Sequence, residues 1–474
     1  MKKLLYSALL LASLSSCGIY TKYQPQTKVP DRLYGDSVMG KSITEYQGEN
    51  KGDTAVADSV SLGFMDWHDL FRDSRLQILI EQALANNTDY QSAQLRVDEA
   101  AATLKAAKLA YLPSFALGPQ ASVSSFNNQQ AVQTYSVPLT MSWEIDIFGR
   151  LRNAKEQSKA LLAKSKDYRQ AVRTQLIASV ANLYYTLQTL DEQLRISRAT
   201  ESAWQETLVT ARALMKAGRY NEAGVSQMEA TMHSVHTSVV DLESQIAQTE
   251  NSLSILLCET PRQHARNKTD SSCENIQMPE KLAVGIPLQI LSSRPDVRQA
   301  ERSLESAFYG VNLARSSFYP SLTLSGSVGW TNSGGTVITN PGRLLASALG
   351  SLTAPLLTKG QNEAQLKIAK AQQEEARLAY QQTVLNAGKE VNDLLTQWQA
   401  AREKEGSLRQ QVKSLEKTLS STQLLMKNGT NTYLEVLTAR QSLLSAQLQQ
   451  SANRLTEIQS VINLYQALGG GQEK

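Results

Sequence analysis

The stretch TYSVPLTMSWEIDIFGRLRNAKEQ, residues 134–157, changes its periodicity halfway along. Over residues 135–143 apolar side chains alternate with polar ones, which is the period of a β-strand with one apolar face. Beyond Gly149 no proline occurs before Pro261, and most residues are good helix formers. The stretch therefore predicts a strand that leads directly into a very long helix.

Long helices are predicted in two regions that are free of proline, between Pro138 and Pro261 and after Pro355. Apolar residues there step by four and three, for example at Leu176, Val180, Leu183, Leu187, Leu190 and Leu194 and again at Leu408, Val412, Leu415 and Leu419. Such heptad stripes predict left-handed coiled-coil packing. We expect helices over 149–217, 221–258, 360–428 and 431–467. The first would be about 100 Å long at about 1.5 Å per residue.

Strands are expected over 113–126, 132–144, 320–332 and 344–357, where apolar and polar side chains alternate. Each has about ten residues with one apolar face, enough to cross a bilayer as a tilted strand. The alternative is a soluble sheet packed on another layer, but no other segment supplies the apolar face that it needs. An open sheet edge in lipid leaves backbone groups unpaired, and closed barrels need about eight strands. Several copies of the chain must therefore pool their strands.

The two halves of the chain resemble each other. Asp89 and Pro113 recur 207 residues later as Asp296 and Pro320. Residues 214–218, LMKAG, recur 211 residues later as LMKNG. The order helix, β-hairpin, long helix, turn, helix thus occurs twice. The expected domains are repeats over 73–260 and 288–468, joined by a linker at 261–287 and followed by a flexible tail at 469–474.

The amino terminus is typical of an export signal. Lys2 and Lys3 precede an apolar run, residues 4–14, that is too short to span a bilayer. The small residues before Cys17 are typical of a lipobox, in which residues 1–16 are removed and the cysteine is acylated; a plain secretory signal is the alternative. Gly18 favours sorting to the outer membrane. Residues 17–72 would then form a lipid-anchored, extended segment.

Composition and residue clusters limit the chemistry. Aromatic residues make up 6% and charged residues 19%, which favours long helices, and a net charge of +4 gives no case for nucleic acid.

Cys258 and Cys273 remain besides Cys17, and a disulfide, free thiols or a zinc site with His264 are the open alternatives. His233 and His236 lie three apart with no third ligand nearby in sequence. The sequence contains no familiar catalytic or cofactor motif, so we expect no enzyme, cofactor or metal centre.

Several motifs follow the order of a known family: DIFGR at 146–150, LSSRPDVRQAE at 291–301, FYPS at 318–321 and, after Gly429, YLEVL at 433–437. Behind a lipobox they closely resemble the outer membrane factor lipoproteins of tripartite, RND-type multidrug efflux systems, which are TolC-like and NodT-like. The resemblance covers nearly all of the mature chain. It implies a homotrimer with a shared twelve-stranded β-barrel and a coiled-coil α-barrel in the periplasm. It also implies a periplasmic adaptor and an inner-membrane RND pump as partners.

The resemblance also implies a gate at the periplasmic tip, just after the turn at Gly429. It puts Leu434 at an apolar constriction, accompanied by a ring of acidic side chains that selects ions. The position that is usually aspartate corresponds to Thr438, so Glu435 is the candidate for the charge. Asn431 stands where some relatives carry arginine. Glu435 is alternatively an ordinary solvated helix residue.

We therefore predict a mainly α-helical protein with transmembrane β-strands that serves as the exit duct of an efflux pump in the outer membrane. The alternative is a periplasmic coiled-coil adaptor or structural lipoprotein without a channel. Such an adaptor would carry compact β domains at the ends of a single helical hairpin, whereas here the expected strands interrupt the helices twice. The sequence leaves the cargo open among drugs, metal ions and other small molecules.

Overall fold

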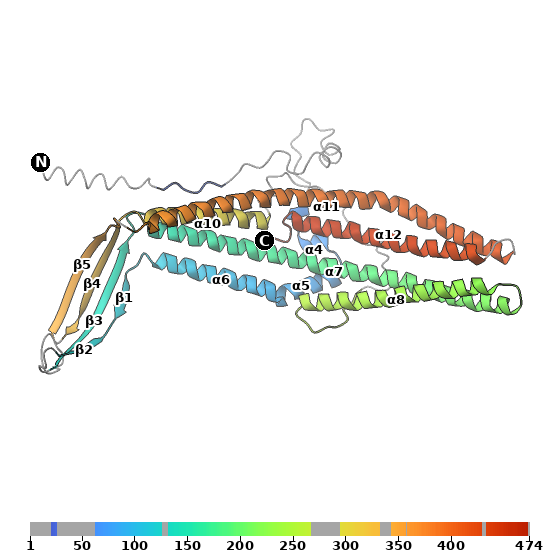
Figure 1. The fold of residues 1–474 in the computed structure, drawn as a ribbon, viewed down its shortest axis with the longest axis horizontal. Coiled ribbons are helices and arrows are strands. Elements are labelled where there is room, and N and C mark those ends of the chain that lie inside the picture. The colour runs from blue at the N-terminus through green and yellow to red at the C-terminus, as the bar shows by residue number, and fades with distance from the viewer. Residues whose placement is uncertain are drawn as a thin grey trace, which may run out of the picture. The chain divides into compact units, whose positions relative to one another are not determined.

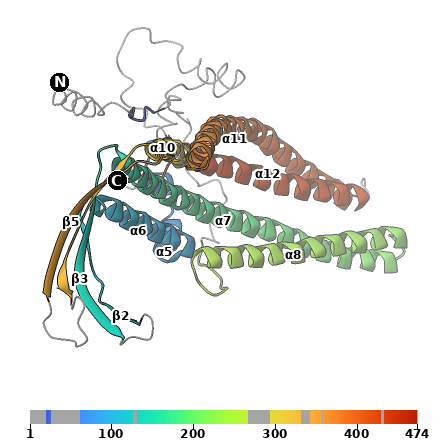
Figure 2. The same ribbon diagram turned by 60° about the vertical axis from the view of Figure 1, so that its left-hand side comes forward.

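The computed structural model describes residues 20–25, 62–125, 131–266, 294–331, 343–356, 358–428 and 433–472 (Figures 1 and 2). The chain divides into two compact units. The sheet unit comprises Met1–Lys28, Gln94–Asp167 and Val297–Thr383. The helical unit comprises Val29–Ala93, Tyr168–Asp296 and Val384–Lys474.

The helices come in pairs of equal length. Helices α6 (Thr88–Leu109) and α10 (Pro295–Ser316) have 22 residues each. Helices α7 (Arg150–Lys216) and α11 (Gln361–Lys427) have 67 each, and α8 (Glu222–Leu256) and α12 (Tyr433–Ala467) have 35 each. These matched lengths confirm the internal repeat. Among the helices that the structure describes, none combines the length and the apolar character needed to cross a membrane.

In the described chain three short helices lie before α6: η3 (Leu62–Phe64), α4 (Trp67–Leu70) and α5 (Ser74–Asn86). Asp66 caps α4 by accepting from the backbone N–H of His68, and Asp73 caps α5 by accepting from that of Arg75. Asn87 separates α5 from α6, and its side-chain oxygen accepts from the backbone N–H of Asp89 at 3.0 Å. The helix starts are thus set by Asp and Asn residues that satisfy otherwise unpaired N–H groups.

The strands of the sheet unit form one antiparallel sheet (Figure 1). Its members are β1 (Ser114–Leu117), β2 (Gln120–Ser124), β3 (Val132–Ile145), β4 (Ser321–Thr331) and β5 (Arg343–Thr353). Both β1 and β2 pair with β3, which pairs with β4, which pairs with β5. Within the described chain, β5 and the β1–β2 segment therefore form the two outer edges of the sheet.

The expected strand over 113–126 is interrupted in the structure. Leu117 pairs with Leu139 and Gln120 pairs with Ser136, so the register continues across the break without a shift. Pro119 has no N–H to give to the ladder, whereas Gly118 N still donates to Pro138 O at 3.2 Å. β1 and β2 therefore occupy one strand position, and the sheet has four positions.

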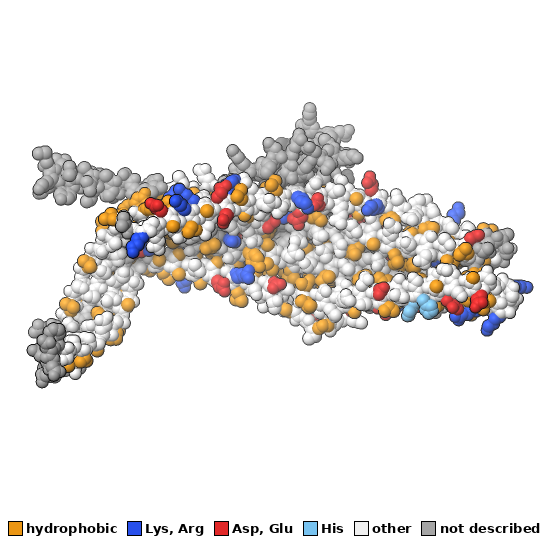
Figure 3. Space-filling model, in the orientation of Figure 1, with side chains coloured by type: hydrophobic (Ala, Val, Ile, Leu, Met, Phe, Trp, Pro, Cys, Tyr) orange, Lys and Arg blue, Asp and Glu red, His pale blue; other side chains and the backbone are white. Residues whose placement is uncertain are grey.

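The sheet has two chemically different faces. In register, Val137, Trp330 and Leu344 form one cross-strand row, and Leu139 pairs with Val328 on the same side. The alternate residues are mainly hydroxylic: Ser136, Thr140 and Ser142 of β3, Thr323, Ser325, Ser327 and Thr331 of β4, and Ser347 and Ser351 of β5, with Leu345 and Leu349 as apolar exceptions. In Figure 3 the visible surface of the sheet is mostly white and orange. One face thus suits lipid and the other suits water.

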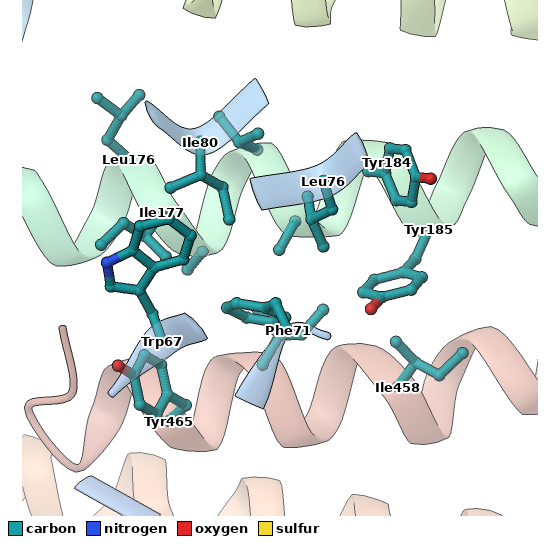
Figure 4. Close-up of a cluster of buried hydrophobic side chains, with 14 of the residues drawn as sticks. Trp67, Phe71, Leu76, Ile80, Leu176, Ile177, Tyr184, Tyr185, Ile458 and Tyr465 are labelled. Carbon is teal, nitrogen blue, oxygen red and sulfur yellow. The ribbon is translucent and has the colours of Figure 1, made fainter. Parts of the chain in front are cut away.

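The main core of the helical unit joins the short helices to α7 and α12 (Figure 4). Phe71, Leu76 and Ile80 are buried there against Ile177 of α7 and Tyr465 of α12. Tyr465 Oη donates to Met65 O at 3.1 Å, so the phenol is satisfied inside the cluster. These residues fasten the start of the first repeat to the end of the second.

We expect Ile80→Ala to lower the free energy of unfolding by about 2 to 5 kcal/mol, because Ile80 is 0% exposed and its loss leaves a cavity. Ile78→Ala is the matched control, since Ile78 lies on the same helix and is 61% exposed. The control should cost about 0.5 kcal/mol or less. Thermal unfolding of the purified protein measures both. Equal losses for the two variants would contradict the assigned core.

Candidate functional site

The DIFGR segment forms the turn between β3 and α7. The two carboxylate oxygens of Asp146 accept from the backbone N–H groups of Leu151 at 3.0 Å and Arg152 at 2.8 Å. They thereby cap the first turn of α7. Gly149 has a φ of +73°, a conformation that favours glycine. A Cβ at this position would also lie only 3.2 Å from Tyr20 Cε2, so the space favours glycine as well. This motif is the strand-to-helix connection.

Aromatic side chains gather at the same junction. Phe148 stacks on Tyr319, with ring centroids 5.3 Å apart and planes 18° apart. Trp143 Nε1 donates to Tyr111 O at 2.8 Å, which ties β3 to the end of α6. Of the described side chains on the strands, Glu144 alone is charged, and it pairs with Arg150. An aromatic band beside strands with few charged side chains is typical of a membrane–water interface.

The RPD motif ties three helices together in the helical unit. Arg294 is buried, and it donates to Asp296 Oδ2 and to Glu390 Oε2, each at 2.7 Å. Its Nη1 also donates to Ala467 O, a carbonyl at the carboxyl end of α12, at 2.5 Å. The guanidinium therefore satisfies a helix end and links α10, α11 and α12. This role is structural.

The residues expected to form the gate lie at the amino end of α12. Leu434 is 60% exposed, and Glu435 and Thr438 are exposed as well. Thr438 Oγ1 donates to Leu434 O at 2.9 Å, so its hydroxyl proton is engaged within the helix. Glu435 lies in the first turn of α12, where a negative charge is favourable to the helix dipole. Asn431 lies outside the described residues.

A hydrophobic cluster packs α12 against α7 and α8, close to these residues in the helical unit. Its buried members are Trp204, Leu208, Ala211, Val225, Met228, Val235 and Leu444. Arg440 of α12 lies over the Trp204 ring, with Cζ 5.4 Å from the centroid, and its Nη1 donates to Thr207 Oγ1 at 3.3 Å. Burial lowers the pKa of the Arg440 guanidinium from its ordinary value, and Glu206 offsets part of this effect. Arg440 thus docks α12 on α7 by a cation–π contact and a hydrogen bond.

Sequence reasoning missed Arg440, although a signal was present. Leu437, Arg440, Leu444 and Leu448 step by three and four, so the arginine occupies a position on the apolar stripe of α12. Its counterpart in the first repeat is Glu229, which instead pairs with Arg212 at 2.6 Å within its own hairpin. Two features of the sequence could therefore have indicated this contact. Arg440 is a charged residue on an apolar stripe, and the two repeats differ at this position.

The cysteines and histidines do not converge in the described chain. Cys258 is exposed, while Cys17 and Cys273 lie outside the described residues, so acylation and a disulfide stay predictions. His264 Nε2 lies 2.8 Å from Ser254 Oγ, and burial lowers the pKa of its ring below the usual range. His233 and His236 are exposed, and His236 Nδ1 lies 2.7 Å from Glu201. Among the described residues, no three His, Cys, Asp or Glu side chains could hold a metal ion.

A sheet with one apolar and one hydroxylic face, an aromatic boundary and paired coiled-coil helices defines a channel subunit of the outer membrane. A family model described as "Outer membrane efflux protein" matches residues 79–259 and 286–470. The chain belongs to this family, which is a family of transport channels.

The chain is similar to the probable outer membrane lipoprotein SilC of Salmonella typhimurium, at 30% identity over 409 residues that cover 85% of this chain and 88% of SilC. It is 27% identical to the toluene efflux pump outer membrane protein TtgC of Pseudomonas putida, over 99% of this chain and 96% of TtgC. The open state of the MtrE outer membrane channel of Neisseria gonorrhoeae matches with a TM-score of 0.82 and 27% identity, over 96% of this chain and 98% of MtrE. The chain is thus an outer-membrane efflux channel subunit.

Replacing Arg440 should loosen the tip of α12. We expect Arg440→Ala to accelerate amide hydrogen exchange over residues 434–444 about fivefold, because a cation–π contact is worth about 1 kcal/mol. Exposed Gln441 on the same helix supplies the control, Gln441→Ala, which should leave exchange unchanged. Hydrogen–deuterium exchange mass spectrometry measures both. Unchanged protection in Arg440→Ala would show that the contact does not hold α12.

Proposed function

We propose that three copies of this chain form one conduit across the outer membrane and the periplasm. The observation that carries the proposal is the pair of sheet edges, β5 and the β1–β2 segment, left unpaired within the described chain. In lipid each unpaired backbone group costs several kcal/mol, so the edges must meet partners. Four strand positions per chain are too few for a closed barrel of about eight or more strands. Three copies supply twelve positions, the number implied by the family resemblance.

The two faces of the sheet suit this arrangement. With the row of Val137, Trp330 and Leu344 against lipid, the seryl and threonyl hydroxyls line the interior. Ser327 Oγ and Ser347 Oγ lie 2.7 Å apart and form one hydrogen bond, and most of the lining is polar and uncharged. Glu144, which pairs with Thr323 in the register, is a charged residue on this face. Such a lumen passes small solutes by diffusion. In this proposal the protein conducts and catalyses no reaction.

The duct works with two partners, a periplasmic adaptor and an inner-membrane pump of the RND type. The relatives leave both small organic molecules and metal ions as possible cargo, because TtgC is named for a toluene efflux pump and CusC of Escherichia coli for a cation efflux system. The mainly hydroxylic lining suits uncharged molecules, because hydroxyl groups neither attract nor repel a particular charge. The directing energy then comes from the pump, and the duct provides the path.

The gate of this proposal is the ring that three copies of the α12 tip would form. Leu434 and Glu435 are exposed in the single chain and therefore free to face the axis. Leu434 would close the pore by an apolar constriction, and Glu435 would hold cations beside it. Thr438 and Asn431 complete the ring as polar side chains. Arg440, docked on Trp204, is the contact that α12 must break to move outward.

The gate predicts a different effect for each of its two principal residues. Leu434→Ala should raise the conductance of the closed channel by about twofold or more, because the apolar constriction widens. Glu435→Gln should weaken block by divalent cations, because the carboxylate ring is lost. Exposed Glu416 of α11 supplies the control, Glu416→Gln, which should change neither property. Planar-bilayer recordings measure both. Wild-type conductance and block in both gate variants would overturn the assignment.

The membrane assembly itself is tested with the lipid-free variant Cys17→Ser. We expect it to remain a heat-sensitive trimer in the outer-membrane fraction, because the strands and not the acyl chains hold the protein in the bilayer. The wild-type protein should incorporate labelled palmitate, and the variant should not. Fractionation and gel mobility with and without heating supply the measurements. A soluble monomer after loss of the lipid would instead favour a coiled-coil adaptor or structural lipoprotein.

A further inference from the structure

An open groove lies between α6 and α7 in the sheet unit, where the two helices run side by side (Figures 1 and 2). Its volume is about 830 Å³, and four lysines line it: Lys108, Lys155, Lys159 and Lys166. Glu156 is the one acidic residue of the lining, and it lies 3.9 Å from Lys155 and 3.7 Å from Lys159. Within the described residues, neither Lys108 nor Lys166 has a salt bridge. The groove therefore carries an excess of positive charge.

The second repeat provides an internal comparison. By the offsets of 207 and 211 residues, Leu104 corresponds to Val311 and Lys155 corresponds to Leu366. Val311 is buried there between α10 and α11, and Leu366 packs against its cluster. In the second repeat, apolar side chains thus fill this place. In the first repeat, the same place is an open groove lined by lysines. Coiled-coil packing alone does not require this difference, since the second repeat packs without it.

In the proposed duct, the groove starts at the membrane boundary, next to the sheet. Tyr111 lines its upper end, and the Tyr111 carbonyl accepts from Trp143 of β3, three residues before β1 begins at Ser114. Lys155 Nζ lies 5.5 Å from the Tyr111 ring centroid. Lys155 is about 8 Å along α7 from its first residue, at about 1.5 Å per residue. That depth falls within the headgroup layer below the hydrocarbon.

We propose that this groove binds the phosphate headgroup of an anionic phospholipid from the periplasmic leaflet of the outer membrane. Lys108 and Lys155 contact the phosphate, Tyr111 lies against the glycerol region, and Lys159 and Lys166 draw the anion in by their field. The inference goes beyond conduction and rests only on the membrane crossing of the strands. In each chain, a lipid bound between α6 and α7 would fix the depth of the channel in the membrane.

The test is native mass spectrometry of the delipidated wild-type oligomer with added dioleoyl phosphatidylglycerol or zwitterionic dioleoyl phosphatidylcholine. We expect the anionic lipid to bind about tenfold more tightly, and Lys108→Gln/Lys155→Gln to abolish this preference. The matched control is Arg315→Gln/Lys370→Gln, which removes the charges corresponding to Lys108 and Lys159 in the second repeat. This control should bind lipid like the wild type.

Each other result overturns the proposal. Equal binding of the two lipids, or equal losses in both double variants, would show that the lysines make no specific site. Displacement of the lipid by millimolar inorganic phosphate would identify a site for soluble anions. Dissociation of the oligomer in Lys108→Gln/Lys155→Gln with unchanged lipid per chain would make the groove a contact between copies. The expected result differs from all of these: a Lys108→Gln/Lys155→Gln variant that conducts normally but lacks the lipid preference supports the lipid site and leaves the proposed duct unaffected.

Discussion

Backbone hydrogen bonding at the sheet edges is the constraint on which the rest of this protein depends. A strand in lipid has no water to satisfy its N–H and C=O groups, so an edge such as β5 must meet another strand. The single chain supplies four strand positions and cannot close them on itself. Association follows from this requirement, and the apolar and hydroxylic faces of the sheet suit lipid on one side and water on the other. The connections that lead out of the sheet must meet it too.

The strand-to-helix junction meets that requirement with side chains. Asp146 takes over the first N–H groups of α7 where the ladder of β3 ends, and Gly149 supplies the backbone turn. At the carboxyl end of α12, Arg294 likewise satisfies a backbone group by donating a hydrogen bond to Ala467 O. The family motifs are therefore mainly devices that satisfy backbone groups. They preserve the frame, while the two proposed sites, the tip of α12 and the groove of Lys155, lie where the two repeats diverge.

Much of the fold could be predicted from the sequence because periodicity and proline placement are local properties. The break at Pro119 was missed, since alternation of side chains continues through a residue that cannot donate to the ladder. The candidate gate residues came from family resemblance, and the structure adds that Leu434 and Glu435 are exposed. Arg440 was not predicted, because its partner Trp204 is far away in sequence and only packing brings them together.

The sequence by itself determined the elements: paired helices of equal length, strands with one apolar face, and a repeat that doubles the unit. Each of these depends on neighbours within a few residues, which the chain order already specifies. Tertiary structure alone decided that Arg440 docks on α7 and that the first repeat leaves open a groove that Leu366 helps to fill in the second. Such contacts depend on distances between helices, and those distances are set by the packing of all the side chains between them.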